Sequence, residues 1–266
     1  MENTRPPMYA GSFYPASKKE LSLMINSFLK KSISKKQKGE LKALIVPHAG
    51  YVYSGVVAAF AYNLIKAAKS KNIILFGPSH SVYINGAYGF SGIWQTPFGE
   101  VKISSSDLPI VKGDKEHCLE VQLPFLQTIL KKFEFKPIIY GEISSEELAD
   151  IIETENNALE NNNSKNKKDS LLIASSDLSH YLTYAEAKKI DLETINSILE
   201  LNFEKFEKTG DACGKTGIGA LIILAKKNNW KPVLLDYKNS GDTAGDKKGV
   251  VGYTAIAFFE KERVGD

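Results

Sequence analysis

Arginine is nearly absent from this chain. Of the 34 lysines and arginines among its 266 residues, only Arg5 and Arg263 are arginines. The planar guanidinium group supplies the paired hydrogen bonds that proteins use on guanine edges and phosphates, so this composition is poorly suited to reading DNA. The net charge of +3 is also small, and the lysines are spread along the sequence. We therefore expect no nucleic-acid partner.

Cysteine and long apolar stretches are scarce as well. The two cysteines, Cys118 and Cys213, cannot build a disulfide framework. No stretch approaches the roughly 18 apolar residues that a membrane span needs, and the sequence opens without an apolar leader region. These absences lead us to expect a cytoplasmic, reducing location and no membrane partner. Free thiols in such a location more often serve metal binding or chemistry than cross-linking.

Segments with the pattern of buried strands alternate with segments of helical periodicity. Near-continuous apolar strands favour a sheet that is covered by helices on both faces. The sequence therefore predicts an α/β fold, a single-domain α/β/α sandwich over residues 5–260 with a mixed, largely parallel central sheet. A polar stretch at 155–169, rich in asparagine and lysine, is interpreted as a surface insertion within that domain.

The same patterns predict individual elements. Strands are expected at 41–46, 72–76, 137–140, 170–175, 233–237 and 250–259. Helices are expected at 17–31, 54–69, 117–133, from about 144, at 184–201 and at 217–228. Pro124 either kinks or breaks the third of these helices. The glycine- and aromatic-rich stretch that ends near Ser106 is more typical of hairpins.

Polar residues follow three of the predicted strands at the point where each strand ends. His48 and His80 each follow a short apolar strand, and Asp177 and His180 follow a third. Ligands of open α/β sheets bind at the carboxyl ends of strands, so we expect these side chains to form one site. Cys213 directly precedes an apolar helix, whose start would place the thiol in a locally positive field.

Each of these residues also has a purely structural interpretation. Asp177 is of a type that caps turns, and His180 is of a type found on surface loops. Cys213 and Cys118 are of a type that often behaves as a small buried hydrophobe. Tyr51 is equally typical of ordinary aromatic packing. The residue pattern alone leaves these alternatives open.

Seven ordered motifs give the chain a resemblance to a known family. They are A-G-S-F-Y-P (10–15), V-P-H-A-G-Y (46–51), F-G-P-S-H (76–80), E-H-C-L-E-V-Q-L-P-F (116–125), S-S-D-L-S-H-Y (175–181), C-G (213–214) and V-V-G-Y (250–253). Together they resemble the Memo family, which is named after an animal mediator of receptor-driven cell motility. The fold of that family is similar to that of class III extradiol dioxygenases, α/β/α sandwiches that hold non-haem iron.

The resemblance implies roles for particular residues. His48 and His80 stand where the two histidine ligands stand, and Cys213 takes the place of the third, carboxylate ligand. Asp177 and His180 match further site residues, with His180 as the natural acid or base and Asp177 either orienting it or acting as an alternative ligand. His180, Asp177 and Cys213 are accordingly the candidate catalytic residues. The candidate pocket-lining residues are Tyr51, Glu116, His117 and Glu120.

The resemblance also implies a cofactor. A thiolate in place of a carboxylate softens the site and shifts its preference toward copper or zinc, with Fe(II) still compatible. We therefore expect one metal ion, Fe(II) or copper, with zinc as the alternative. Cys118 replaces the serine that is usual in its motif, so we do not expect it to be a ligand throughout the family.

Three functions are consistent with these residues. The first is a metal-dependent oxidoreductase related to non-haem iron dioxygenases, acting on a small molecule or a peptide. The second is an inactive adaptor that binds a peptide or an anionic ligand near Tyr51, His80 and Cys213, although scarce arginine weakens phosphate capture. The third is a hydrolase with Cys213 as nucleophile and His180 or His80 as base. Microbial family members further resemble components that work with a radical-SAM protein, which implies a functional link of that kind.

Overall fold

The apolar runs of the sequence form the centre of a mixed, eight-stranded sheet. The computed structural model describes residues 3–33, 37–66, 68, 72–111, 115–130, 132–162 and 170–260. The strands of the main sheet are β2 (Glu40–Val46), β3 (Asn72–Pro78), β4 (Ala87–Gly89), β7 (Glu134–Tyr140), β8 (Leu171–Ser175), β9 (His180–Leu182), β10 (Trp230–Asn239) and β11 (Val250–Glu260). Their order is β10–β11–β2–β8–β3–β7–β4, with β9 paired to β11. Strands β2, β8, β3 and β7 are mutually parallel, and the flanking strands run antiparallel to them.

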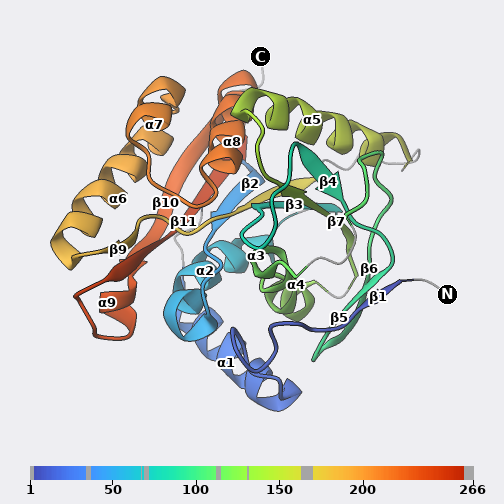
Figure 1. Ribbon diagram of the computed structural model, residues 1–266, viewed down its shortest axis with the longest axis horizontal. Coiled ribbons are helices and arrows are strands. Elements are labelled where there is room, and N and C mark those ends of the chain that lie inside the picture. Colours follow the sequence, from blue (N-terminus) through green and yellow to red (C-terminus); the bar gives the residue numbers. More distant parts are fainter. Residues whose placement is uncertain are drawn as a thin grey trace.

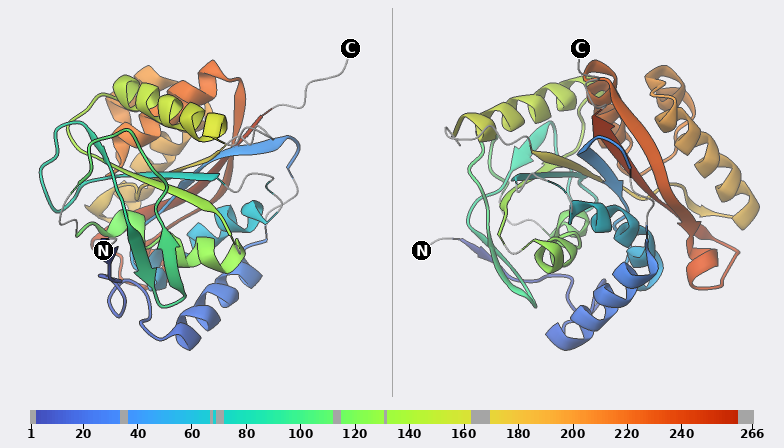
Figure 2. Two further views of the ribbon diagram at one scale, coloured as in Figure 1. Left: turned by 90° about the vertical axis from the view of Figure 1, so that its right-hand side faces the viewer. Right: turned by 180° about the vertical axis from the view of Figure 1, so that it is seen from behind.

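Helices cover both faces of this sheet, which confirms the predicted α/β class (Figure 1). One face carries α1 (Lys18–Lys31), α2 (Tyr51–Ile65), α3 (His117–Glu120) and α4 (Leu123–Ile129). The other carries α5 (Ser145–Asn162), α6 (Tyr184–Leu199), α7 (Phe203–Thr209) and α8 (Lys215–Lys227). A short helix, α9 (Ser240–Thr243), follows β10. The two further views in Figure 2 show the sheet between these layers.

A second, smaller sheet ties down the N-terminal segment. It consists of β1 (Thr4–Arg5), β5 (Ile93–Thr96) and β6 (Gly99–Lys102). Strands β5 and β6 form the antiparallel hairpin expected from the glycine- and aromatic-rich stretch, and β1 pairs with β5 in parallel. Gly92, just before β5, has a φ of +90°, and a Cβ there would lie 2.0 Å from the Asn3 carbonyl oxygen. Only glycine permits this close approach of the two backbones.

Two helix predictions differ in detail from the structure. Helix α2 begins at Tyr51, three residues before the expected start, because the Gly50 carbonyl already accepts hydrogen bonds from Tyr53 and Ser54. The segment expected at 117–133 forms two helices, α3 and α4, rather than one. Pro124 lies in the first turn of α4, where a missing N–H costs nothing, so it marks the break rather than a kink.

The expected surface insertion at 155–169 also differs from the structure. Helix α5 continues to Asn162, and Glu155 and Leu159 lie buried on the same face as Ile152. Spacings of three and four residues place these side chains along one stripe, so the segment is amphipathic despite its polar composition. Residues 163–169 lie outside the described part of the chain.

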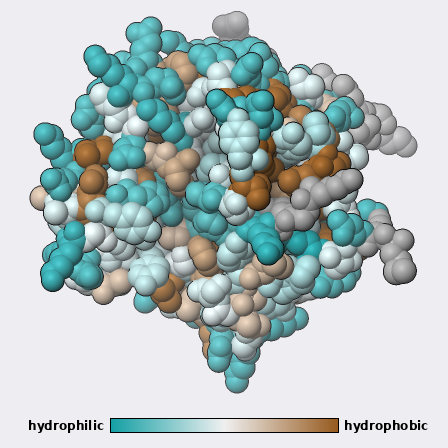
Figure 3. Space-filling model, in the orientation of Figure 1, coloured by the Kyte–Doolittle hydropathy of each residue, from teal (hydrophilic) through white to brown (hydrophobic). Residues whose placement is uncertain are grey.

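The surface is mostly polar on the face shown in Figure 3, where apolar side chains gather in a patch beside α5. Across the described residues, no helix combines the length and apolarity needed to cross a bilayer.

Candidate metal site

The carboxyl ends of three adjacent parallel strands bring the predicted residues together. His48, His80 and Asp177 each lie two residues beyond the end of their strand, β2, β3 and β8 respectively. These strands are neighbours in the order β2–β8–β3, so their ends open onto one edge of the sheet. His117, the first residue of α3, reaches the same edge.

Three imidazoles converge at this edge. His48, His80 and His117 each offer a ligand atom, and these atoms all lie within 4.8 Å of one another. The ring centroids are 5.1 Å apart for His48 and His80, 5.2 Å for His48 and His117, and 4.7 Å for His80 and His117. His48 is buried, whereas the other two rings are partly accessible. The sequence had placed His117 in the pocket lining, and the structure makes it a full member of the histidine group.

The hydrogen bonds of Ser175 fix the tautomer of His48. The Ser175 hydroxyl donates its one proton to the Cys118 carbonyl at 2.6 Å and accepts from the Gln122 amide at 2.9 Å. Its contact with His48 Nδ1 at 3.0 Å must therefore be one in which the imidazole donates. Nδ1 thus carries the proton, and Nε2 keeps its lone pair for a metal or a proton.

Glu116 fixes the other two rings in the same way. Its buried carboxylate lies 2.9 Å from His80 Nδ1 and 2.8 Å from His117 Nδ1, and it also accepts from the His80 and His117 backbone N–H groups. Burial by itself would raise the pKa of Glu116, but the hydrogen bonds from His117 and His80 outweigh it and hold the pKa far below its ordinary value. The carboxylate is therefore charged, and both rings donate to it from Nδ1.

The electrostatics favour a neutral His48. Burial lowers the pKa of His48 well below its ordinary value, and the neighbouring rings of His117 and His80 lower it further. A neutral imidazole is the form that binds a metal. Three imidazoles whose Nδ1 atoms are held by a carboxylate or a hydroxyl form the arrangement that usually surrounds a bound metal ion. The donor set of the described residues therefore fits a transition metal.

Cys213 borders the histidine group. Its Sγ lies 3.2 Å from His48 Nε2 and accepts from the Asp177 backbone N–H at 3.3 Å. The thiol was expected to feel a positive field at the start of α8. Burial, followed by the nearby Asp177 charge, instead raises the pKa of Cys213 to about 12. Without a metal, the sulfur is a thiol that can hydrogen-bond to His48.

Asp177 joins the ends of β8 and β2. Its Oδ1 accepts from the backbone N–H groups of His48 at 2.8 Å and Ala49 at 3.4 Å, so it caps the turn that carries His48. Burial raises the pKa of Asp177 to about 6, against the lowering effect of these hydrogen bonds. Asp177 therefore caps the turn after its strand and also lies beside His48 in the site.

The remaining candidates lie around this group. His180 is partly exposed in β9 and lies close enough to lower the pKa of Asp177 and of His48. Tyr51 is buried, and its hydroxyl donates to the Val121 carbonyl at 2.6 Å. Glu120 is also buried and receives hydrogen bonds from the N-terminal segment.

A second group of ligand-type atoms consists of His80, Glu116 and Cys118. The Glu116 carboxylate in this group is occupied by donors from His80, His117 and Cys118. The Cys118 thiol is fully buried and donates to the Pro78 carbonyl at 3.2 Å. We therefore assign this group to the support of the three imidazoles rather than to a separate ion.

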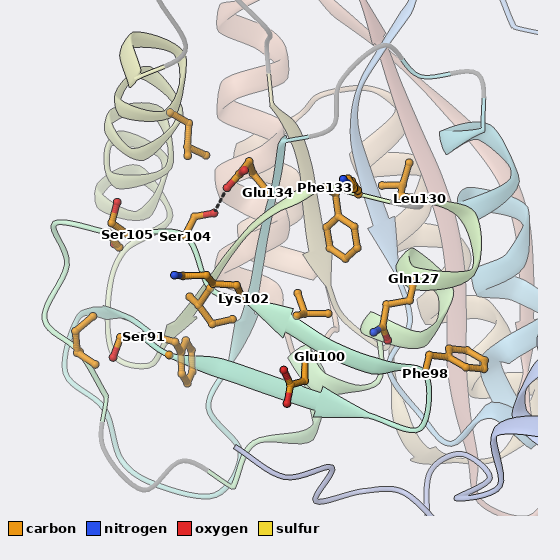
Figure 4. Close-up of a pocket in the computed structure, with 18 residues that line it drawn as sticks. Ser91, Phe98, Glu100, Lys102, Ser104, Ser105, Gln127, Leu130, Phe133 and Glu134 are labelled. Carbon is orange, nitrogen blue, oxygen red and sulfur yellow. Dashed lines mark hydrogen bonds between the residues drawn. The ribbon is translucent and has the colours of Figure 1, made fainter. Parts of the chain in front are cut away.

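A large groove lies elsewhere on the molecule, between the β5–β6 hairpin and the segment that joins α4 to β7 (Figure 4). It has a volume of about 1010 Å³, and its lining contains no histidine, cysteine or aspartate. Phe98 and Phe133 line it, and Ser104 donates to Glu134 at 2.9 Å across its wall. None of the predicted site residues reaches it.

The chain is similar to known proteins over nearly its whole length. The profile of a family described as Memo-like protein matches residues 5–257. A protein named MEMO1 family protein from Nitrosopumilus maritimus is 36% identical, over 96% of this chain and 99% of the relative. A MEMO1 family protein from Thermoplasma volcanium is 36% identical, over 95% and 97%. One from Methanosarcina mazei is 34% identical, over 95% and 98%.

Proposed function

The chain belongs to the Memo-like family, and from this premise we propose that it holds one transition-metal ion at the edge of its sheet and uses it in redox chemistry on a small-molecule ligand. His48 and His80 are two of the proposed ligands, and Cys213 and His117 are the candidates for further ones. The observation that carries the proposal is the convergence of three imidazoles whose Nδ1 atoms are all held by hydrogen bonds.

Cys213 is the third ligand that the family resemblance implies, although the ligand atoms that lie within 4.8 Å of one another include His117 rather than Cys213. Its sulfur already contacts His48 Nε2, and a bound cation would deprotonate the thiol despite its raised pKa. Two imidazoles and a thiolate suit copper, zinc or Fe(II), so the donor set by itself does not select one metal. His117 is the ring that completes the set when the thiol stays protonated.

The chemistry divides between the ion and the protein. A bound iron or copper ion would supply one-electron chemistry at this position. His180, which is partly exposed, would take up a proton from the ligand or deliver one to it. Asp177 holds the turn of His48, and Glu116 holds the rings of His80 and His117, so the donors are arranged before any ion arrives.

Metal content tests this proposal. The wild type, a His48→Ala, His80→Ala double variant and a Cys213→Ser variant are purified without oxygen and without affinity-tag metal, and each is analysed by mass spectrometry. We expect near-stoichiometric metal in the wild type and metal content reduced by about tenfold or more in both variants. His180→Ala is the matched histidine control and should keep its metal. Full occupancy in the double variant, or no metal in the reconstituted wild type, would overturn the proposal.

One observation favours a second function, a cysteine hydrolase. The contact between Cys213 Sγ and His48 Nε2 is the nucleophile–base pair that such an enzyme needs. The raised pKa of Cys213 opposes it, because a reactive thiol normally has a lowered pKa. Rapid alkylation of Cys213 that chelators leave unchanged would support the hydrolase, and slow alkylation would count against it.

A further inference from the structure

The N-terminal segment runs against the side of the metal site that α3 forms. We name residues 3–15 the N-terminal strap. It starts beside β5 and passes along the α3–α4 side of the molecule to α1 (Figure 1). Its residues are separated from α3 by more than 100 positions in the sequence, yet they make several hydrogen bonds to that one short helix.

Glu120, the last residue of α3, receives most of these hydrogen bonds. Its fully buried carboxylate accepts from the Met8 backbone N–H at 3.1 Å, the Tyr9 backbone N–H at 2.8 Å and the Tyr14 hydroxyl at 2.6 Å. It also pairs with the Arg5 guanidinium, which donates in addition to the Glu116 carbonyl at 2.9 Å. A buried carboxylate with four donors strongly resists rearrangement, because each broken bond would leave a buried charge under-satisfied.

The strap places two aromatic rings on His117. The Phe13 ring centroid lies 4.8 Å from that of His117, and the Tyr9 centroid lies 5.6 Å from it. Tyr9 and Phe13 also pack edge-on against each other at 5.1 Å. The Phe13 carbonyl accepts from the Tyr51 backbone N–H at 2.8 Å, which fixes this part of the strap to the start of α2.

Helix α3 therefore carries two carboxylates with different tasks. Glu116, just before its start, orients the rings of His80 and His117 from one side. Glu120, at its end, holds the strap whose rings contact His117 from another side. We propose that Glu120, Arg5 and Phe13 are positioning residues of the metal site, which hold His117 toward His48 and His80 through the strap. This inference rests on the proposed function only in assigning metal binding to the His117 ring that the strap positions.

The reactivity of His117 tests the positioning role. Metal-free wild type, Arg5→Gln and Phe13→Leu are treated with diethyl pyrocarbonate, and modification of each histidine is followed by peptide mass spectrometry. Loosening the strap should raise the modification rate of His117 by about tenfold or more in both variants. The rate for His180 should not change, because no strap contact reaches it among the described residues. Lys227→Gln, which breaks an exposed ion pair with Glu153 far from the site, is the matched control.

Two further measurements separate a loss of positioning from a loss of folding and from a loss of metal. Urea unfolding establishes that each variant is folded, and Arg5→Lys should restore the wild-type rate of His117 in part because it keeps the charge. The rate of metal release to a chelator should rise in the same order as the modification rate. A wild-type His117 rate in both folded variants would overturn the positioning role. Absence of metal from the wild type would overturn the proposed function instead and leave the reactivity result standing.

Discussion

At the scale of single residues, the site depends on which ring nitrogen of His48, His80 and His117 donates a hydrogen bond. Ser175 has only one proton to give, and the Cys118 carbonyl takes it, so His48 must donate from Nδ1. Glu116 has none to give when charged, so His80 and His117 must donate as well. Each imidazole thus donates from Nδ1, and this follows from hydrogen-bond counting alone.

Replacing Ser175 by alanine should therefore weaken metal binding without touching a ligand. The His48 Nδ1 proton would lose its acceptor, so the ring would no longer be held in one tautomer and one orientation. We expect metal affinity to fall about 10- to 100-fold, as measured by competition with a chelator of known affinity.

Ser197→Ala is the matched control for this variant. Ser197 is equally buried, but its hydroxyl donates to the Thr194 carbonyl within α6. Its single hydrogen bond should cost about 1 kcal/mol of stability when lost, and the variant should keep the wild-type metal affinity. Equal affinities in the two variants would show that Ser175 does not orient His48.

The sequence predicted part of the site at this scale. His48, His80 and Asp177 could be found because each directly follows an apolar strand, and strand ends are where such folds bind ligands. The role of Ser175 could not, since this last residue of β8 acts through contacts with residues 53 to 127 positions away. The membership of His117 in the histidine group depends on how α3 packs on β3, which no local pattern encodes.

At the scale of elements, β3 and α3 pack so closely that only glycine fits at one position. A Cβ on Gly77 would lie 2.6 Å from Cys118 Sγ and 3.2 Å from Leu119 Cδ2. Because His80 lies two residues beyond β3 and His117 begins α3, this close packing sets the distance between the two histidines. Cys118 is thus a packing residue in this contact.

Gly77→Ala should destabilise the protein, and Cys118→Ala should relieve part of the cost. The added methyl group overpacks a tight contact, which costs about 1–3 kcal/mol. Removing the sulfur alone leaves a small cavity and costs about 1 kcal/mol. In the double variant the methyl group occupies the space of the sulfur, so the two effects should be non-additive by about 1–2 kcal/mol in urea unfolding. Strict additivity would mean that β3 and α3 separate freely.

Most elements were predictable, and the exceptions have physical causes. Helix α1 matches its predicted range, with Ser17 as its cap and Leu21, Ile25 and Leu29 as its buried stripe. Helix α5 continues into the stretch interpreted as an insertion because Glu155 is buried against Lys136 of the sheet, and a carboxylate gives no apolar signal in the sequence. Helix α7 was not predicted, since its seven residues contain one buried apolar side chain, Phe206.

At the scale of the whole molecule, two apolar cores lie on opposite faces of the sheet, and the metal site lies at the sheet's edge. Strand alternation sends Phe135 and Ile139 of β7 into the core with α1 and α2, and Ile138 and Tyr140 into the core with α5 and α8. Lys136 follows the same alternation, so its charge points into the second core. There it meets Glu155 of α5 at 2.5 Å, with both side chains only 3% exposed.

Removing one partner of this buried ion pair should lower the free energy of unfolding more than replacing both partners with apolar residues. Lys136→Met or Glu155→Leu alone leaves one buried charge without its partner and should lower the free energy of unfolding by about 3–5 kcal/mol. The double variant Lys136→Met, Glu155→Leu removes both charges and should recover most of this loss, because two apolar side chains can pack where the ions met. Urea unfolding measures all three, and breaking the exposed Lys227–Glu153 pair by Lys227→Met should cost no more than about 1 kcal/mol. If the loss of stability in the double variant equals the sum of the two single losses, the two residues do not stabilise the protein through each other. Glu155 would then contribute through the hydrogen bond that it accepts from the Asp107 backbone N–H.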